Sequence, residues 1–140
     1  MSGISGRGWL VDAGVALKWF RSPAVEPDAE TARELIGAAP IKATSLAFFE
    51  VGSVLARTPE ASPALVEESL RTMLRICGPP VELDAADFGP CAHLAEKHRI
   101  TFYDASYVAI ADRLNRRVVS ADRDLLGPGL AVDLATAAAS

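Results

Sequence analysis

The sequence has few residues that could bind a metal through nitrogen or sulfur, or cross-link a small secreted protein. It contains two cysteines and two histidines among 140 residues. Neither Cys77 nor Cys91 belongs to a CxxC pair, so we expect reduced thiols in a cytoplasmic protein rather than a disulfide framework. His93 and His98 are separated by four residues in a charged segment, and this spacing gives no zinc-binding pattern.

Long apolar runs and an excess of basic residues are also lacking. No uncharged apolar run approaches the roughly 20 residues of a transmembrane helix, and residues 1–8 lack the apolar segment of a secretory signal peptide. We therefore expect neither a membrane protein nor a secreted one. The net charge of -4 argues against binding of nucleic acid by bulk positive charge. It still allows an enzyme whose carboxylates gather in one cleft, with basic groups at the rim.

What is present is the composition of an ordinary globular protein. Half of the residues are apolar and 23% are charged, and the length favours one domain over residues 1–140 with a core at about 9–134. Short apolar runs alternate with segments of helical periodicity. They predict strands at 9–11, 41–44, 81–83, 117–120 and 130–134, and helices at 15–20, 28–38, 45–57, 63–77, 84–99 and 103–115.

Several local signals refine these predicted elements. Ser45 and Ser62 are candidate N-caps for the helices that follow them. Gly89 and Pro90 should break or restart the helix predicted at 84–99. Residues 122–126 should form a short helical turn, and residues 135–140 have the composition of a fraying tail.

Apolar strands separated by helices predict βαβ units, and hence a parallel sheet with helices on both faces. In such sheets ligands bind beyond the carboxyl ends of the strands. Asp12 directly follows the strand at 9–11, and Asp122 follows the strand at 117–120. Both are therefore candidate site residues, although each could simply cap the helix after it. Asp124 competes with Asp122 for that capping role.

Two further carboxylates lie on predicted helices. Asp104 opens the helix at 103–115, where an acid also interacts favourably with the helix dipole. Glu50 is the only charged residue between Lys42 and Arg57. A lone acid in an apolar helix points either to solvent, which is the more frequent case, or into a cleft of the protein.

Four carboxylates at one edge of a sheet would repel one another unless a cation neutralised them or some kept a proton. Oxygen ligands without clustered histidine or cysteine select Mg²⁺ or Mn²⁺ over zinc. Acidic sites of this kind mostly serve phosphoryl transfer. No glycine-rich nucleotide-binding loop is present, so we expect no cofactor other than the metal ion.

Four segments in this order resemble motifs of the PIN-domain family, specifically the VapC-type toxin ribonucleases. They are Leu10–Phe20, Glu50–Leu55, Tyr103–Ala111 and Ser120–Leu126. The resemblance implies a three-layer α/β/α sandwich with a central, mainly parallel five-stranded sheet. It also implies that the metal-binding and catalytic residues are Asp12, Glu50, Asp104 and Asp122.

The sequence departs from the family pattern at three positions. Gly14 stands where serine is frequent, Ser53 where asparagine is frequent, and Ser120 where threonine is frequent. The first two changes affect hydrogen bonds that would orient the carboxylates, whereas Ser120 keeps a hydroxyl that could donate to a neighbouring carboxylate. Whether Asp124 is a further ligand or a helix cap stays open.

The resemblance implies a Mg²⁺- or Mn²⁺-dependent endoribonuclease, the toxin of a type II toxin–antitoxin pair. The metal, held mainly by Asp12 and Asp104, would activate a water for in-line attack on a phosphate. The implied partners are an RNA substrate, a cognate antitoxin and a second copy in a homodimer. One alternative is a PIN-like module that binds RNA or protein without cutting it. A phosphatase with Asp12 as nucleophile is disfavoured, because Gly14 stands where that chemistry needs a second aspartate.

Two groups of residues are candidates for binding these partners. The first consists of basic residues that would bind RNA if they lie at the rim of the site, and otherwise form ordinary surface: Lys18, Arg21, Arg113, Arg116, Arg117 and Arg123. The second lies on the first predicted helix, where Trp19 and Phe20 would anchor an antitoxin segment or else join Leu17 in the core.

Overall fold

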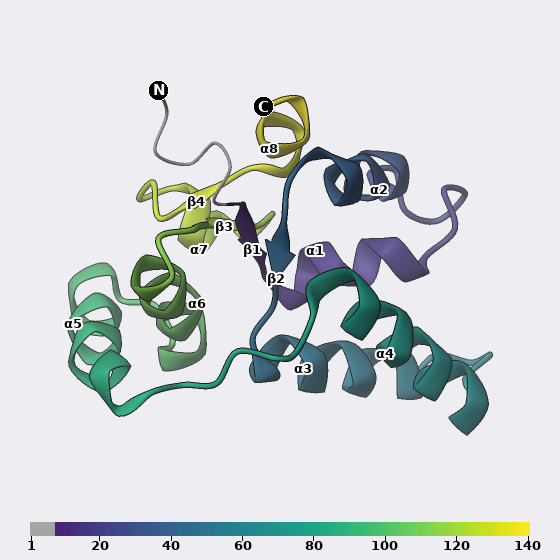
Figure 1. The fold of residues 1–140 in the computed structure, drawn as a ribbon, viewed down its shortest axis with the longest axis horizontal. Coiled ribbons are helices and arrows are strands. Elements are labelled where there is room, and N and C mark those ends of the chain that lie inside the picture. The colour runs from purple at the N-terminus through teal and green to yellow at the C-terminus, as the bar shows by residue number, and fades with distance from the viewer. Residues whose placement is uncertain (1–7) are drawn as a thin grey trace.

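The computed structural model describes residues 8–140. The prediction that the N-terminus is not a signal peptide concerns mainly residues 1–7, which lie outside the described residues. A parallel sheet with the strand order β2-β1-β3-β4 lies at the centre (Figure 1). Its strands are β1 (Trp9–Val11), β2 (Ile41–Lys42), β3 (Arg117–Val119) and β4 (Ala131–Val132). Helices flank this sheet, which confirms the predicted α/β class.

The helices lie on both sides of the sheet. In Figure 1, α5 (Phe88–His98) and α6 (Phe102–Arg113) are on the left, and α6 contacts β1 and β3. On the right are α1 (Ala13–Leu17), the 3-10 turn η1 (Lys18–Phe20), α2 (Ala29–Ala38), α3 (Ser45–Ala56) and α4 (Pro63–Cys77). The remaining elements are η2 (Ala85–Asp87), α7 (Arg123–Leu126) and α8 (Leu134–Ala139).

The central strand β1 forms the middle of the core. It pairs with β2 on one side and with β3 on the other, in a register that sets Leu10 beside Val118 and Val11 beside Val119. Leu10 and Val11 are completely buried, because both faces and both edges of the strand are covered. This explains why the strand is apolar at successive positions rather than at alternate ones.

The sheet has four strands rather than the predicted five. Residues 81–83 do not form a strand, and Val81 makes only an isolated parallel bridge to Thr44. Its amide donates to the carbonyl of Ala43 and its carbonyl accepts from Ser45. The chain then turns away at Asp84, whose side chain caps η2, so the pairing cannot extend.

The helix predicted at 84–99 restarts next to Gly89 and Pro90, as expected, because the 3-10 turn η2 ends at Asp87 and α5 begins at Phe88. Gly89 and Pro90 lie in the first turn of α5, where the missing amide of proline leaves no helical bond unmade.

One other prediction about helices is wrong. Residues 135–140 are not a fraying tail, since most of them belong to α8. Asp133 caps that helix, and its buried residues Leu134 and Ala137 face α2, against which it packs.

The N-terminal caps follow the sequence signals closely but not completely. The Ser62 hydroxyl caps α4 as predicted, with Pro63 in the first turn. For α3 the cap is Thr44, one residue before the predicted Ser45, and its hydroxyl accepts from the amide of Ala47 at 3.2 Å. Ser45 is instead the first helical residue.

Trp19 belongs to the core, and its small exposed part lines a groove between η1, α2 and α4. It is buried, and its indole Nε1 donates a hydrogen bond to the carbonyl of Ala32 at 2.8 Å. The prediction that Leu17 is a core residue is confirmed, since it is buried too. Phe20 is half-buried, and it is the aromatic residue of η1 that remains available to a partner.

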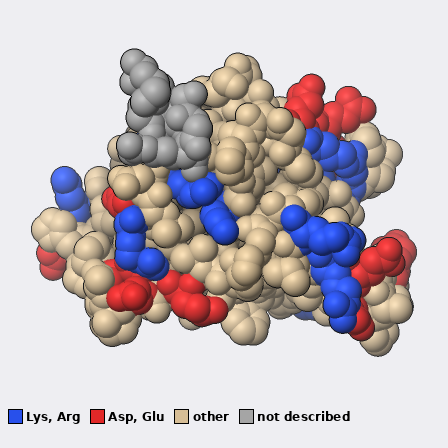
Figure 2. Space-filling model, viewed as in Figure 1, with Lys and Arg blue, Asp and Glu red and all other residues tan. Residues whose placement is uncertain are grey.

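Charge is distributed in small patches over the surface. On the face drawn in Figure 2, basic and acidic side chains are interspersed and no basic surface runs across the molecule. Within residues 8–140, no helix combines the length and the apolar character that crossing a membrane requires.

The different burial of Trp19 and Phe20 leads to a first prediction. Trp19→Ala should lower the free energy of unfolding by about 3–5 kcal/mol, because it leaves a large cavity and an unpaired carbonyl at Ala32. Phe20→Ala should cost clearly less. Denaturant unfolding of both variants checks this, and equal losses of stability for the two would contradict the burial of Trp19.

Candidate active site

The carboxyl ends of β1 and β3 bring the first two candidate acids to one edge of the sheet. Val11 and Val119 are paired in register, so Asp12 and Ser120 follow them at neighbouring positions, and Asp122 comes two residues later. The amide of Asp12 donates to the carbonyl of Val119 at 3.3 Å. The rule that residues just beyond parallel strands meet at one edge therefore holds here.

Asp12 is buried, and each of its carboxylate oxygens accepts one hydrogen bond. Its Oδ1 accepts from the amide of Val15 at 2.9 Å, which caps α1, and its Oδ2 accepts from the hydroxyl of Ser120 at 2.5 Å. Burial raises the pKa of this carboxyl, the two hydrogen bonds oppose that rise, and the charges of Asp122 and Asp104 add to it. The capping role and the location at the sheet edge thus coexist in one side chain.

Ser120 connects the ends of the two strands. Its hydroxyl donates to Asp12 as predicted, and its oxygen also accepts from the amide of Asp122 at 2.9 Å. Asp122 in turn accepts from the amide of Asp124 at 2.9 Å and caps α7. The capping role therefore belongs to Asp122, and the side chain of Asp124 does not fill it.

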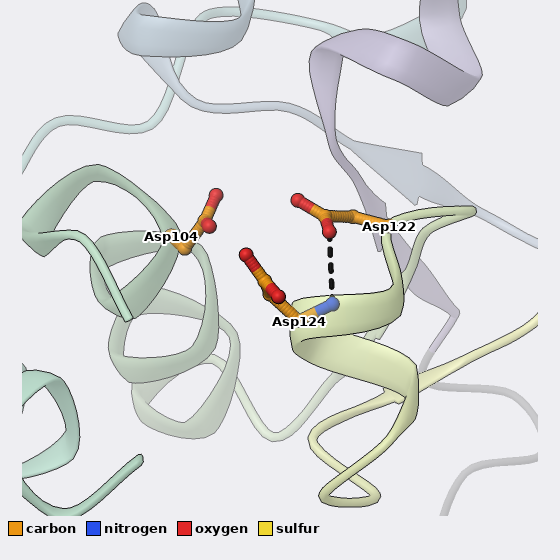
Figure 3. Close-up of side chains that lie close together, drawn as sticks. All are labelled: Asp104, Asp122 and Asp124. Carbon is orange, nitrogen blue, oxygen red and sulfur yellow. Dashed lines mark hydrogen bonds between the residues drawn. The ribbon is translucent and has the colours of Figure 1, made fainter. Parts of the chain in front are cut away.

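Asp104, Asp122 and Asp124 form a tight carboxylate group, which Figure 3 shows with the side chains turned toward one another. Each offers one oxygen, and the three oxygens lie within 4.8 Å of one another. Asp104 lies in the first turn of α6, which is capped by Thr101 and not by Asp104 itself. Its pKa is raised by burial and then by the charges of Asp122, Asp124 and Glu50.

A pocket of about 340 Å³ joins this group to the other two predicted acids. All four of the predicted site residues line it, and the lining consists of Asp12, Ala13, Gly14, Lys18, Arg21, Glu50, Asp104, Tyr107, Ala121 and Asp122. Glu50 reaches the pocket from α3, and it accepts a hydrogen bond from the hydroxyl of Tyr107 at 2.8 Å. The structure thus brings the four residues together, and it adds Asp124 at their side.

Sequence reasoning missed the part played by Tyr107 and left Asp124 undecided. From the sequence alone, Tyr107 is predicted to be one more residue on the apolar face of the helix at 103–115. The available signal was its hydroxyl, because a buried tyrosine needs a hydrogen-bond partner. Burial, followed by the bond to Glu50, raises the pKa of Tyr107, so the hydroxyl stays protonated and donates to Glu50.

Five of the six basic candidates divide into two groups, and the sixth, Arg123, is exposed on α7. Lys18 and Arg21 line the pocket. Arg113 instead forms a bidentate ion pair with the buried Asp87, at 2.9 to 3.2 Å. Arg116 donates to the carbonyls of Trp9 and Pro40. Arg117 donates to the carbonyl of Gly129.

The donor set of the pocket suits a hard divalent cation. The side chains in its lining that could bind a metal ion through a negative charge are all carboxylates, and neither histidine nor cysteine lines it. Carboxylate oxygens are what Mg²⁺ and Mn²⁺ prefer, whereas zinc sites rely on nitrogen and sulfur. The residues of the pocket therefore fit a magnesium or manganese ion.

Comparison with protein families bears directly on this set of acids. The sequence model of the PIN domain matches residues 9–127, a range that contains all five carboxylates. The chain belongs to the PIN domain family. PIN domains are typically nucleases that depend on a divalent metal ion. A search of curated proteins gave no significant match.

A solved structure shares the fold of this PIN domain. The crystal structure of PAE2754 from Pyrobaculum aerophilum superposes with a TM-score of 0.70, over 99% of this chain and 92% of that chain. The sequence identity is 23%. The two proteins therefore share a fold at low sequence identity.

The raised pKa of Asp104 predicts how stability depends on pH in the absence of divalent ions. An unfolded aspartate titrates near pH 3.9, so the folded protein binds a proton more tightly and loses stability as the pH rises from about 4 through the raised pKa. Asp104→Asn should therefore melt at a higher temperature than the wild type at pH 7 in EDTA. This difference should vanish below about pH 4, where both side chains are neutral.

Glu30→Gln is the matched control for this experiment. Glu30 is an exposed acid in the first turn of α2, so its loss removes only a dipole interaction of about 0.3–1 kcal/mol. The control variant should melt slightly lower than the wild type. If Asp104→Asn also lowers the melting temperature at pH 7, the repulsion inferred for the pocket is refuted.

Proposed function

We propose that this PIN domain is a Mg²⁺- or Mn²⁺-dependent endoribonuclease and acts as the toxin of a type II toxin–antitoxin pair. The supporting observation is that Asp12, Glu50, Asp104 and Asp122 line a single pocket. A protein that only binds a partner has no need to bring mutually repelling carboxylates together. The toxin assignment rests on the resemblance of the sequence motifs to those of VapC-type proteins.

In this proposal the carboxylates divide the work between holding the metal and shaping the pocket. Asp104, Asp122 and Asp124, whose oxygens lie within 4.8 Å of one another, would hold the ion together with Asp12. When bound, the ion would supply Lewis-acid stabilisation of the phosphate charge and activation of a water for in-line attack. Attack on phosphorus breaks one P–O bond of the RNA backbone.

The other residues of the pocket keep the acids in position. Ser120 and the amide of Val15 fix both oxygens of Asp12. Glu50 is exposed to solvent, and the hydrogen bond from Tyr107 restrains its carboxylate at the pocket. Partners that orient metal ligands in this way commonly contribute 10- to 100-fold in metal affinity or activity.

The alternative function is a module that binds RNA or protein without cutting it. The observation in its favour is that Gly14 has no side chain to hydrogen-bond Asp12. A Cβ atom at this position would lie 3.6 Å from Asp12 Oδ1, so the serine that is frequent in VapC-type sequences would add a hydroxyl beside that carboxylate. Here Ser120 and the amide of Val15 are the groups that bind Asp12.

Cleavage of RNA distinguishes the two functions. With Mn²⁺ or Mg²⁺ the wild type should cut structured RNA, and EDTA should abolish the activity. Asp104→Asn and Asp122→Asn should each lower the rate at least about 100-fold, because a direct ligand matters more than the groups that orient it. The measurement is a gel assay of RNA cleavage with and without the divalent ion.

Two controls separate loss of catalysis from loss of folding. Asp104→Asn should keep the fold, since Thr101 caps α6, and Glu30→Gln should cleave RNA like the wild type. Mn²⁺ should raise the melting temperature of the wild type, because it binds the folded state, and should raise that of Asp104→Asn less. A well-folded wild type that cuts no RNA with either ion would favour the binding module.

The proposed function includes a cytoplasmic location, a homodimer and a cognate antitoxin. The surface that suits the antitoxin is a groove of about 490 Å³ between η1, α2 and α4. Its lining includes Phe20, Ile36, Leu65 and Ile76, of which Ile36 and Leu65 are exposed. An amphipathic segment could cover these apolar side chains. Phe20 is also close to the pocket that the carboxylates line, here called the acid pocket, because Lys18 at the start of η1 belongs to its lining.

Coexpression with a small protein encoded next to this chain tests the groove. Phe20→Ala should abolish copurification and leave the melting temperature nearly unchanged. Phe88→Ala is the control, because Phe88 is also exposed but lies on α5, at the other side of the sheet (Figure 1). Equal copurification of both variants with the small protein would exclude the groove as the binding surface.

A further inference from the structure

Lys18 and Arg21 supply positive charge in the wall of the acid pocket. They are the basic side chains among its lining residues, and they come from η1 and the residue directly after it. A backbone phosphate carries a negative charge, so it is repelled by the carboxylates it must approach. Basic groups on the pocket wall offset this repulsion at the place where the phosphate would enter.

A buried carboxylate holds both cations. Glu26 is only 7% exposed. Its Oε2 accepts from Lys18 Nζ at 3.1 Å, and its Oε1 lies 3.8 Å from Arg21 Nη1. The same carboxylate accepts from the amide of Asp28 at 3.2 Å, and this bond is the main reason why its pKa is lowered. Glu26 thus faces one cation with each oxygen.

The two cations differ in what they leave available to a ligand. The Lys18 side chain is 12% exposed, and its ammonium also lies 3.5 Å from Asp28 Oδ2. The Arg21 side chain is 41% exposed, and among residues 8–140 its one ion-pair contact is the long one to Glu26. A guanidinium carries five N–H donors, so most of those on Arg21 stay accessible from the pocket.

The backbone that carries Arg21 is fixed as well. Arg33, on α2, donates from Nη2 to the carbonyl of Arg21 at 3.1 Å and to the carbonyl of Trp19 at 3.4 Å. Trp19 itself is anchored in the core. These hydrogen bonds hold the backbone of Arg21 in place, and Glu26 restricts the direction of its guanidinium.

We propose that Arg21, assisted by Lys18, binds a backbone phosphate of the RNA beside the acid pocket, and that Glu26 is the positioning residue for this pair. This inference rests on the proposed function, because it names the substrate contact of the same site. An ion pair that only stabilised the loop at 22–28 would not require Arg21 to line the pocket.

The charge of Glu26 makes the proposal sharply testable. Glu26→Gln removes a negative charge from the neighbourhood of the pocket, so bulk electrostatics alone predicts tighter RNA binding. If Glu26 positions Arg21 and Lys18, the same substitution weakens binding. The two explanations therefore predict opposite signs for one variant.

The measurement is fluorescence anisotropy of a labelled single-stranded oligoribonucleotide, with Ca²⁺ as the divalent ion and the integrity of the RNA checked on a gel. Arg21→Gln should weaken binding about tenfold, as loss of a charged hydrogen bond does, and lower the salt slope by about 0.7. Arg21→Lys should restore the slope. Glu26→Gln should also weaken binding, and its effect should be smaller in the Arg21→Gln background, where only Lys18 is left for Glu26 to position.

Glu67→Gln is the matched control, because Glu67 pairs with Arg71 at 2.9 Å on the exposed surface of α4, and its loss changes the net charge equally. It should bind RNA at least as tightly as the wild type. Thermal unfolding checks that each variant is folded at the assay temperature. If Glu26→Gln is unfolded there, the affinities and salt slopes of Arg21→Gln and Arg21→Lys test the proposal.

The proposal is overturned if folded Glu26→Gln binds as tightly as the wild type or tighter, if its effect is undiminished in the Arg21→Gln background, or if Arg21→Gln changes neither affinity nor salt slope. These outcomes leave the nuclease proposal intact when the wild type cleaves RNA. A wild type that binds the oligonucleotide without cleaving RNA in Mn²⁺ would refute the nuclease proposal alone. A wild type that does neither would refute both.

Discussion

The burial of Asp12 at the end of β1 is the constraint on which the remainder of the pocket depends. β1 is paired on both edges. The chain leaves the sheet at Asp12, which caps α1, the helix that follows. The Ser120 hydroxyl binds Asp12 and receives the amide of Asp122. Asp122 then caps α7, which carries Asp124. One buried carboxylate thereby sets the location of two others, and their repulsion is opposed by hydrogen bonds already made in the fold.

The parts of this arrangement that follow a strand could be predicted from the sequence. The apolar runs at 9–11 and 117–119 have the composition of buried parallel strands, and the acids after them lie at the shared edge for that reason alone. Glu50 is different, because its location depends on how α3 packs against α1, and no local pattern encodes that packing. Asp124 stayed ambiguous because two aspartates, two residues apart, could each have capped α7.

The predictions that were left open or were wrong concern residues whose surroundings are set by other parts of the chain. The indole of Trp19 finds its partner at Ala32, in the next helix, so the short amphipathic pattern of 15–20 could not show that it is buried. The alanine-rich segment 135–140 is helical because it packs on α2, and α2 is distant in the sequence. Val81 has the composition of a strand residue, yet it makes a single bridge because the chain turns at Asp84. Packing against elements distant in the sequence decided the first two cases, and the local turn at Asp84 decided the third.

The two hydrogen bonds of Ser120 restrict what evolution can place at that position. One atom must donate to Asp12 while it accepts from the amide of Asp122, and the side chain is completely buried. Among the small side chains only a hydroxyl does both at this length; alanine and glycine do neither, and a thiol is a weak donor and acceptor. Serine can thus exchange with threonine where the added methyl group fits, which agrees with the threonine frequent in VapC-type sequences. A lineage that replaced it with any other residue would keep its acids but lose the bridge between the two strand ends.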